Sequence, residues 1–400
     1  MNLAHAARAS CARRVAAVEV GAVIIARSRM NFGLDIRPSL SKPTGVGSYV
    51  LALAQRLPEI APEDRFYFFS ASLRERYPRR TWPDNVKVVD RRLPVRALNY
   101  AWNRLEWPPL DRVVGAPLDL VHSPHPLLIP ARKARHVVTL HDLFFMKHPD
   151  MTEAEIRRDY VPLVREHVRR ADGVICSSEH TASEARLLLE IEPRKMAVIP
   201  LGVDPAYRLP ISDEAVDAIL ARRRLPRGAL LYLGTDEKRK NLVNLAMAYI
   251  GLAGRRSGLP PLVMVGPGSE WAQGGTISGP QIRATGYLET REVRALMAAS
   301  LALVLPSLEE GFGLPVVEAM AAGLPVVCSR GSALEEVAGD AATFVNPLDT
   351  RSIADGIETV LDDPEQRRRQ SRLGLERSKQ FDWDIAAAKT LEFYRRVLSG

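Results

Sequence analysis

Cysteine is scarce in this sequence, which has only Cys11, Cys176 and Cys328 in 400 residues. Three widely spaced cysteines cannot build a disulfide framework or a zinc site, and this favours a reducing, cytoplasmic compartment. Long hydrophobic runs are also missing: no stretch of about eighteen apolar residues occurs, which excludes a membrane-spanning helix. With 46% hydrophobic and 26% charged residues, the chain is not wholly disordered. At about 150 residues per domain, its length predicts two domains or three.

The net charge of +8 is unevenly distributed. Half of it lies in residues 1–29, where five arginines accompany a single acidic residue, Glu19. The apolar run Val15–Ala26 is interrupted by that glutamate, unlike the core of a secretory signal. We expect residues 1–29 to be a disordered extension before a true start at Met30, with an amphipathic membrane anchor as the alternative. The remainder has no basic–aromatic recognition motif, so we expect no nucleic-acid partner.

Short apolar runs alternate with helical stretches, and this alternation predicts parallel sheets covered on both faces. The first series of predicted strands comprises Asn31–Ile36, Phe66–Phe69, Val86–Val89, Leu118–His122, His136–Leu140, Gly173–Cys176 and Met196–Pro200. The second comprises Leu230–Leu233, Leu262–Val265, Gln281–Thr285, Leu301–Leu305, Pro325–Cys328 and Thr343–Val345. We therefore predict an α/β protein with domains at residues 30–205 and 206–382, and a ligand cleft between them.

Residues 74–112 combine ten basic with five acidic side chains, and five Trp or Tyr residues are interleaved among them. One interpretation is an ordinary solvated surface with half-buried aromatic rings. The other is a membrane-interface or lipid-acceptor surface, because basic, Trp and Tyr side chains suit lipid headgroups. Composition leaves both open.

The most informative run is residues 306–326, which follow a predicted strand and open a predicted helix. Glycines in the turn let the backbone approach a ligand closely, and Pro315 suits the first turn of a helix whose free N–H groups face an anion. Glu310 and Glu318 flank this position, where carboxylates can accept hydrogen bonds from sugar hydroxyls. Taken singly, the glycine turn, the proline and the two glutamates also fit an ordinary strand–turn–helix unit whose glutamates lie on the surface.

Two glutamates separated by seven residues in this setting closely resemble the signature of the retaining glycosyltransferases of family 4, and the resemblance extends over most of residues 30–400. It implies a GT-B fold, in which two Rossmann-like domains face a nucleotide-sugar cleft and a C-terminal helix, residues 383–400, packs back on the first domain. It also implies that Glu310 holds donor-sugar hydroxyls and Glu318 the ribose. The backbone that would contact the sugar and diphosphate is that of Gly311, Phe312, Gly313 and Leu314.

Residues 234–241 follow another predicted strand and resemble the family's phosphate-binding segment. Arg and Lys at a strand–helix junction can neutralise a diphosphate, although a solvated basic helix start would look alike. Thr235 stands where one common version of the segment has Arg. We therefore expect Lys240 to hold the leaving diphosphate, with Arg239 as its partner.

Three further positions complete the predicted site. Gly45 and Gly47 fit the family's N-terminal glycine loop, although a lone Gly-x-Gly is a weak signal. His141 follows a predicted strand; alone it would more often be structural, but the family places a His there beside the donor sugar or acceptor. Tyr287 and Leu288 resemble the segment that frames the nucleotide base.

Asp382 and Asp384 have the Asp-x-Asp spacing of metal-dependent transferases of another fold. At the start of a terminal helix we instead expect a capping role. Since basic side chains can replace a metal at the leaving group, we expect neither a metal nor a cofactor, the nucleotide-sugar being a substrate.

The resemblance implies a retaining, metal-independent hexosyltransferase. Segments Thr44–Tyr49, His122–Pro126 and His141–Leu143 resemble the subgroup that makes bacterial surface polysaccharides, including lipopolysaccharide, often from GDP-mannose. The partners would be the nucleotide-sugar and a glycan or lipid-linked acceptor, in the cytoplasm or at the inner face of its membrane. A UDP-sugar donor is the main alternative. A nucleotide-sugar epimerase, a sugar phosphorylase and a non-catalytic sugar-nucleotide binding protein are the rival functions.

Overall fold

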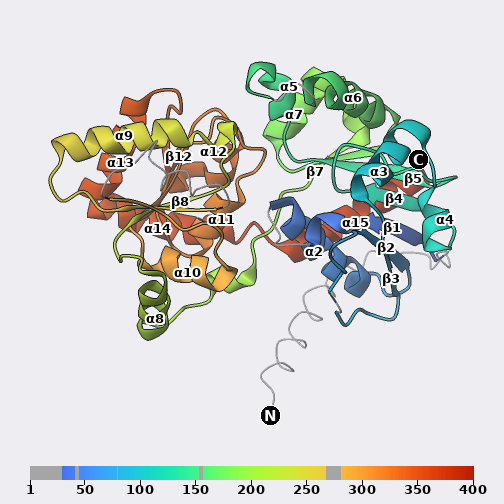
Figure 1. Ribbon diagram of the computed structural model, residues 1–400, viewed down its shortest axis with the longest axis horizontal. Coiled ribbons are helices and arrows are strands. Elements are labelled where there is room, and N and C mark those ends of the chain that lie inside the picture. The colour runs from blue at the N-terminus through green and yellow to red at the C-terminus, as the bar shows by residue number, and fades with distance from the viewer. Residues whose placement is uncertain (1–28, 41–44, 79, 153–155, 267–280) are drawn as a thin grey trace, which may run out of the picture.

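The computed structural model describes residues 29–40, 45–78, 80–152, 156–266 and 281–400 (Figure 1). The expected disordered extension, residues 1–29, lies outside the residues that the structure describes, except for Arg29. Within it, every predicted strand is present and the predicted α/β class is confirmed. Each half of the molecule contains one parallel sheet, the first at the right and the second at the left of Figure 1.

The first sheet has seven strands in the order β3-β2-β1-β4-β5-β6-β7. They are β1 (Asn31–Asp35), β2 (Arg65–Ala71), β3 (Val86–Arg91), β4 (Leu120–Ser123), β5 (Arg135–Leu140), β6 (Gly173–Cys176) and β7 (Met196–Val198). The second has six in the order β10-β9-β8-β11-β12-β13. They are β8 (Leu230–Leu233), β9 (Leu262–Val265), β10 (Ile282–Ala284), β11 (Ala302–Leu305), β12 (Val326–Ser329) and β13 (Ala342–Val345). Both orders are those of Rossmann-like sheets.

Helices connect the strands. In the first half they are α2 (Gly45–Ile60), α3 (Val95–Tyr100), α4 (Leu110–Val114), α5 (Phe144–Lys147), α6 (Val161–Arg170) and α7 (Glu179–Leu189). The second half contains α8 (Asp213–Arg223), α9 (Leu242–Arg255), α10 (Thr290–Ala299), α11 (Leu314–Ala321), α12 (Ala333–Ala338), α13 (Thr350–Asp362) and α14 (Pro364–Ser378). The last helix, α15 (Trp383–Ser399), follows α14.

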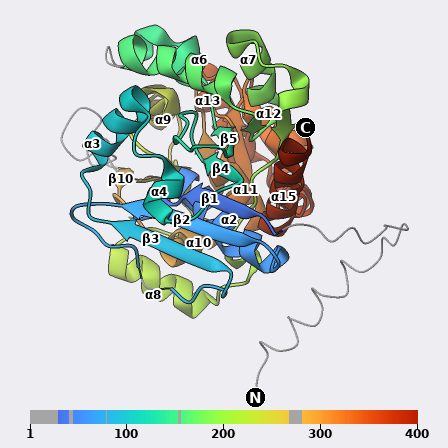
Figure 2. The ribbon, with the colours of Figure 1, turned by 90° about the vertical axis from the view of Figure 1, so that its right-hand side faces the viewer.

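The first sheet is buried on both faces, and its alternating side chains explain how. Phe32, Phe66 and Val137 point toward α2 and α15 and join their core. On the opposite face, Val138 and Val174 pack with α6 and α7, while residues of β2 and β4 pack with α3 and α4. Figure 2 shows α15 alongside α2, with α6 and α7 at another side of the sheet. Burial on two faces is why these strands read as continuous apolar runs.

The helix α15 packs against α2 and β5, so the end of the chain returns to the first half. The chain passes between the two halves near Gly202 and again near Trp383. These two segments are in close contact, because a Cβ on Gly202 would lie 2.3 Å from the Trp383 backbone nitrogen. The side chain of Asp382 accepts a hydrogen bond from the Asp384 N–H at 2.7 Å and caps α15, which confirms the capping interpretation. Asp384 pairs with Arg56 of α2 at 2.6 Å.

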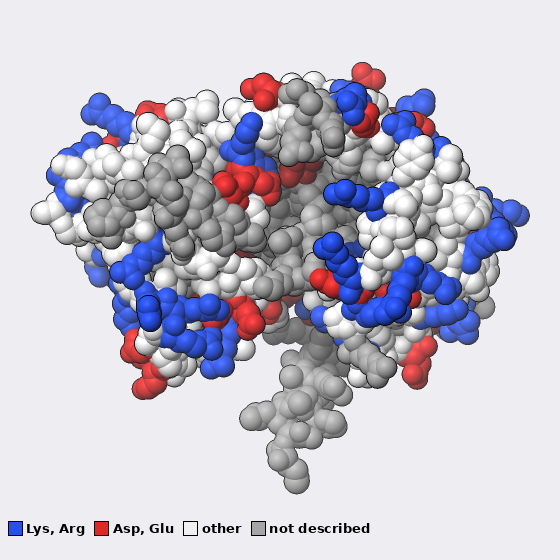
Figure 3. All heavy atoms as spheres, viewed as in Figure 1, with Lys and Arg blue, Asp and Glu red and all other residues white. Residues whose placement is uncertain are grey.

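The aromatic residues of segment 74–112 divide between core and surface. Tyr77 and Trp102 are buried, whereas Tyr100 and Trp107 are 65% and 58% exposed. On the face seen in Figure 3, Lys and Arg side chains gather in the lower part of both halves, on the right near β2 and β3. Within the described residues, no helix is both long enough and apolar enough to cross a membrane.

Candidate active site

A cavity of about 450 Å³ lies where the carboxyl ends of the two sheets face each other. Its walls come from residues that follow β1, β5 and β6 in the first half and β8, β10 and β11 in the second. Open α/β sheets bind ligands at such a place, where the strand order reverses. In the second sheet the reversal falls between β8 and β11, which are paired neighbours. This pairing brings the two most informative sequence segments together.

The loop after β11 carries the two-glutamate signature and leads into α11. Gly313 has a φ of 94° just before the helix, and Pro315 occupies its first turn. Both line the cavity. Gly311 has no room for a side chain, because a Cβ there would lie 1.5 Å from the His141 carbonyl oxygen. The signature loop is therefore pressed directly against the first half of the molecule.

Glu310 lies between the two cations that the sequence predicted for the diphosphate. Its Oε1 is 2.6 Å from Lys240 Nζ, and its Oε2 is 2.9 Å from Arg239 Nη1. The Ser307 hydroxyl donates a third hydrogen bond to Oε1 at 2.8 Å. The basic residues lie on a short helical turn, η7 (Lys238–Lys240), after β8, and the Leu308 N–H donates to the Arg239 carbonyl at 2.7 Å.

The charge of Glu310 is fixed by these neighbours. Burial raises the pKa of its carboxyl, but the nearby charges of Lys240 and Arg239 lower it more, and the resulting pKa is about 2. Burial lowers the pKa of the Arg239 guanidinium, but the combined attraction of Glu310, Asp142 and Glu237 outweighs it, so the pKa lies above its usual value. The site thus carries an ionised carboxylate between two cations, and Arg239 also pairs with Glu237 at 2.8 Å, so an anionic ligand would share these cations with the carboxylates.

His141 is a neutral, hydrogen-bonded imidazole. Burial lowers its pKa to about 4. Its Nε2 donates to the Pro124 carbonyl at 3.1 Å, and the ring meets the edge of Tyr49 with centroids 5.1 Å apart. With Nε2 carrying the proton, Nδ1 remains an acceptor. His141 can therefore position a hydroxyl group without supplying a positive charge.

Glu318 differs from Glu310 because, among the residues that the structure describes, no cation compensates its burial. Burial raises its pKa to about 8, against the lowering effect of a hydrogen bond with Tyr207, so the carboxyl is protonated at pH 7. It lies in α11, one turn beyond the signature loop, and lines the cavity together with Tyr207.

This protonation predicts a pH-dependent donor affinity. If ribose hydroxyls donate to the Glu318 carboxylate, they favour its ionised form, so the donor's KM should fall as the pH rises from 6 toward 8 and then level off. The dependence approaches about tenfold per pH unit well below the pKa if only the ionised form binds. Initial rates across this range measure it, with Glu318→Gln as the control. The same slope in Glu318→Gln would contradict the assignment.

An apolar end of the cavity lies beside β9 and the N-terminal part of α10. Leu288, Val265 and Val293 are buried there, and Tyr287 joins them in the lining. A mostly apolar wall of this kind suits a nucleotide base. It lies in the second half, on the same side as Glu318.

Almost all predicted site residues line this one cavity: Gly45, His141, Thr235, Arg239, Lys240, Tyr287, Leu288, Glu310, Gly311, Phe312, Gly313, Leu314 and Glu318. Gly47 is not among the lining residues but is buried in the first turn of α2. The predicted glycine loop is corrected accordingly: Gly45 and Gly47 both lie in the first turn of α2, and neither has a positive φ.

Ser177 and Tyr207 are among the lining side chains that sequence reasoning missed. Ser177 follows β6 as His141 follows β5, so the parallel arrangement of the strands could have indicated it. Tyr207 lies in the connection between the halves, and no local pattern marks it.

Comparison with known proteins agrees with this geometry. The family model described as glycosyl transferases group 1 matches residues 223–377, and that of glycosyltransferase family 4 matches residues 43–207. The O-antigen chain mannosyltransferase B of Escherichia coli is 31% identical over 373 residues, covering 88% of this chain and 96% of that protein. The chain belongs to the family 4 glycosyltransferases.

Solved structures show the same GT-B fold. Sucrose-phosphate synthase from Thermosynechococcus elongatus matches with a TM-score of 0.74 and 20% identity, over 93% of this chain and all of that one. Anabaena HepE, solved with UDP-glucose, matches with a TM-score of 0.68 and 16% identity, over 91% of this chain and all of that one. In this family 4 glycosyltransferase, the two matched regions meet at the cavity, the first bringing His141 and the second Lys240, Glu310 and Glu318.

Proposed function

We propose that this glycosyltransferase moves a sugar, with retention of its anomeric configuration, from a nucleotide-diphosphate donor to a glycan or lipid-linked acceptor in surface polysaccharide synthesis. The observation that carries the proposal is the buried Glu310 carboxylate between Lys240 and Arg239 in the interdomain cavity. GDP-mannose is the favoured donor, because the E. coli relative that aligns over most of the chain is named an O-antigen chain mannosyltransferase.

Charge stabilisation of the leaving group is the main chemistry that the site can supply. As the bond between the sugar and the diphosphate breaks, negative charge grows on the phosphate beside Lys240, Arg239 and the N-terminus of α11. The acceptor hydroxyl then attacks the same face of the sugar and passes its proton to the departing phosphate oxygen. Glu310 holds the sugar hydroxyls, and the neutral His141 positions the sugar or the acceptor.

We further propose that the reaction needs no divalent metal. The two cations beside Glu310 support this proposal, because they can neutralise a diphosphate as a metal ion would. Asp382 and Asp384 are engaged at the start of α15 in capping the helix and pairing with Arg56.

The donor base is tested by a thermal-shift panel of GDP, UDP, ADP and dTDP in the presence of a chelator. We expect GDP to raise the melting temperature most, since a ligand at 100 times its Kd adds about 2.7 kcal/mol of stability. A larger shift with UDP would favour a UDP-sugar, the type of donor bound in the Anabaena structure. A shift that appears only when magnesium replaces the chelator would contradict the metal-free proposal.

A peripheral contact with the cytoplasmic membrane would suit a lipid-linked acceptor. The surface around α3 exposes Tyr100, Leu105 and Trp107 at 65%, 64% and 58%, next to the exposed Arg96 and Arg104. Aromatic and basic side chains together favour the headgroup region of an anionic bilayer. Sedimentation with vesicles containing anionic lipid tests this contact, and equal recovery with neutral vesicles would contradict it.

A further inference from the structure

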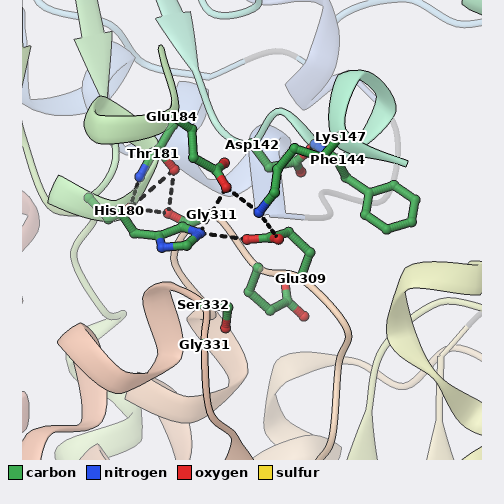
Figure 4. A network of polar contacts seen from close by, with 12 residues as sticks. Asp142, Phe144, Lys147, His180, Thr181, Glu184, Glu309, Gly311, Gly331 and Ser332 are labelled. Carbon is green, nitrogen blue, oxygen red and sulfur yellow. Dashed lines mark hydrogen bonds and ion pairs between the residues drawn. The ribbon is translucent and has the colours of Figure 1, made fainter. Parts of the chain in front are cut away.

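A second cluster of charges joins the two halves beside the signature loop (Figure 4). Lys147 comes from α5, and His180 and Glu184 come from α7, all in the first half. Glu309 comes from the loop after β11 in the second half and is 3% exposed. Its carboxylate pairs with Lys147 and with His180 Nε2, the latter at 2.6 Å. Glu184 completes the cluster, contacting Lys147 and, at 3.2 Å, His180.

Glu309 and Glu310 are consecutive residues that bind opposite halves of the molecule. Glu310 pairs with Lys240 and Arg239 of its own half, whereas Glu309 pairs across the cleft. A displacement of the first half therefore pulls on the residue next to Glu310. The mechanism above uses Glu310 and leaves Glu309 without a role.

The N-terminal end of α7 and the two serines before it make other contacts across the cleft. Hydroxyls of Ser177 and Ser178 donate to the Gly311 carbonyl, each at 2.8 Å. The Glu336 carboxylate of α12 accepts the backbone N–H groups of Glu179 and His180 at 3.0 Å. Free N–H groups at a helix N-terminus are thus satisfied by a carboxylate of the other half. These contacts form only when the halves are together.

The charges of the cluster balance when it is closed. Hydrogen bonds with Glu184 and Glu309 raise the pKa of His180 to about 9, so the ring is cationic at neutral pH. Two cations then face two carboxylates. Ligand atoms of His180, Glu184 and Glu309 lie within 4.8 Å of one another, close enough to hold a metal ion, but the Lys147 ammonium already contacts both carboxylates. The arrangement is a set of ion pairs between domains.

We propose that Glu309, Lys147, His180 and Glu184 form an interdomain latch that holds the closed cleft and keeps Glu310 in register with His141. These are positioning residues, since none of the four lines the cavity. The expected effect on kcat rests on the proposed transfer reaction. The distance between the two halves can be measured without any activity.

Three variants test the latch by kinetics: Glu309→Gln, His180→Gln and the double variant. We expect each single change to lower kcat roughly tenfold, and the double variant to be little worse than either, because coupled pairs are non-additive. The Kd of the nucleoside diphosphate that gives the largest shift in the thermal-shift panel should change less than threefold in each variant. Glu358→Gln is the matched control, since its ion pair with Arg255 lies within the second half; it should keep the wild-type kcat.

The pH profile separates this role from general stability. The charged groups that contact His180 are Glu184 on its own helix, Glu309 from the loop after β11 and, at its backbone, Glu336 from α12. Lys147 from α5 contacts the carboxylates of Glu184 and Glu309. Because its pKa is raised to about 9, the His180 ion pairs exist below pH 9 and are lost above it. Wild-type kcat should therefore fall as the pH rises through 9, and His180→Gln should lack this fall.

A distance measurement tests the latch independently of transfer. Spin labels at Arg186→Cys and Asp340→Cys, both exposed positions, report on the two halves in a Cys11→Ser background. We expect Glu309→Gln to shift the distance distribution to longer values and Glu358→Gln to leave it unchanged. Unchanged distances in Glu309→Gln, or additive kinetic effects, would overturn the proposal. If the wild type shows no sugar transfer while Glu309→Gln shows the expected distance shift, only the proposed function is refuted.

Discussion

Lys240→Ala is expected to lower kcat by two to three orders of magnitude while changing the donor's KM far less. The Lys240 ammonium lies in the cavity, 2.6 Å from Glu310, at the position where charge grows on the leaving diphosphate. Its contribution is therefore larger in the transition state than in the ground state. Losing one such group costs roughly 3–4 kcal/mol, on the order of 10²–10³ in rate. Steady-state kinetics with the donor as variable substrate measures it.

Lys238→Ala is the matched control for this experiment. Lys238 belongs to the same short turn, η7, but its side chain is exposed and lies outside the cavity lining. It should retain close to wild-type kinetics. Equal losses in both variants would show that the turn matters only for folding, and a wild-type rate in Lys240→Ala would remove Lys240 from the mechanism.

Glu310→Gln should separate turnover from nucleotide binding. The carboxylate occupies the space between Lys240 and Arg239 that the diphosphate must share. Removing its charge while keeping its shape should tighten the binding of the nucleoside diphosphate roughly threefold to tenfold, from about 1 kcal/mol of relieved competition. Turnover should fall roughly 10- to 150-fold, since a hydrogen bond from a sugar hydroxyl to a charged acceptor contributes about 1.5–3 kcal/mol.

Calorimetric titration and initial rates measure the two effects in the same protein. Glu365→Gln, an exposed position on α14, is the control and should change neither value. Weaker nucleotide binding in Glu310→Gln would mean that the carboxylate organises the two cations rather than competing for them. An unchanged kcat would contradict its assignment to the donor sugar.

The strands and the main site segments were predictable because both depend on local sequence. Strands buried on two faces must be apolar throughout, so Leu230–Leu233 and Leu262–Val265 stand out as runs and appear unchanged as β8 and β9. The segments around Lys240 and Glu310 each follow such a strand. Parallel neighbours put their carboxyl ends at one edge, so these segments meet once β8 pairs with β11.

The side-chain contacts and pKa values that depend on packing between the two halves could not be predicted from the sequence. Nothing in the local sequence says that Glu309 faces His180 while Glu310 faces Lys240, because that choice is set by the path of the loop against the first half. The raised pKa of Glu318 arises from burial in the assembled cleft. Gly47 was assigned to a loop from a two-glycine pattern, yet it lies in the first turn of α2.

The central claim is sugar transfer with retention in this cleft, and the linkage in the product tests it most directly. The experiment incubates the enzyme with GDP-mannose, whose sugar is α-linked, a synthetic acceptor that ends in a mannosyl residue on an alkyl chain, and a chelator. Nuclear magnetic resonance of the anomeric carbon and proton then identifies the new bond. We predict an α-linked product that is absent when Lys240→Ala replaces the wild type. A β-linked product would contradict the account.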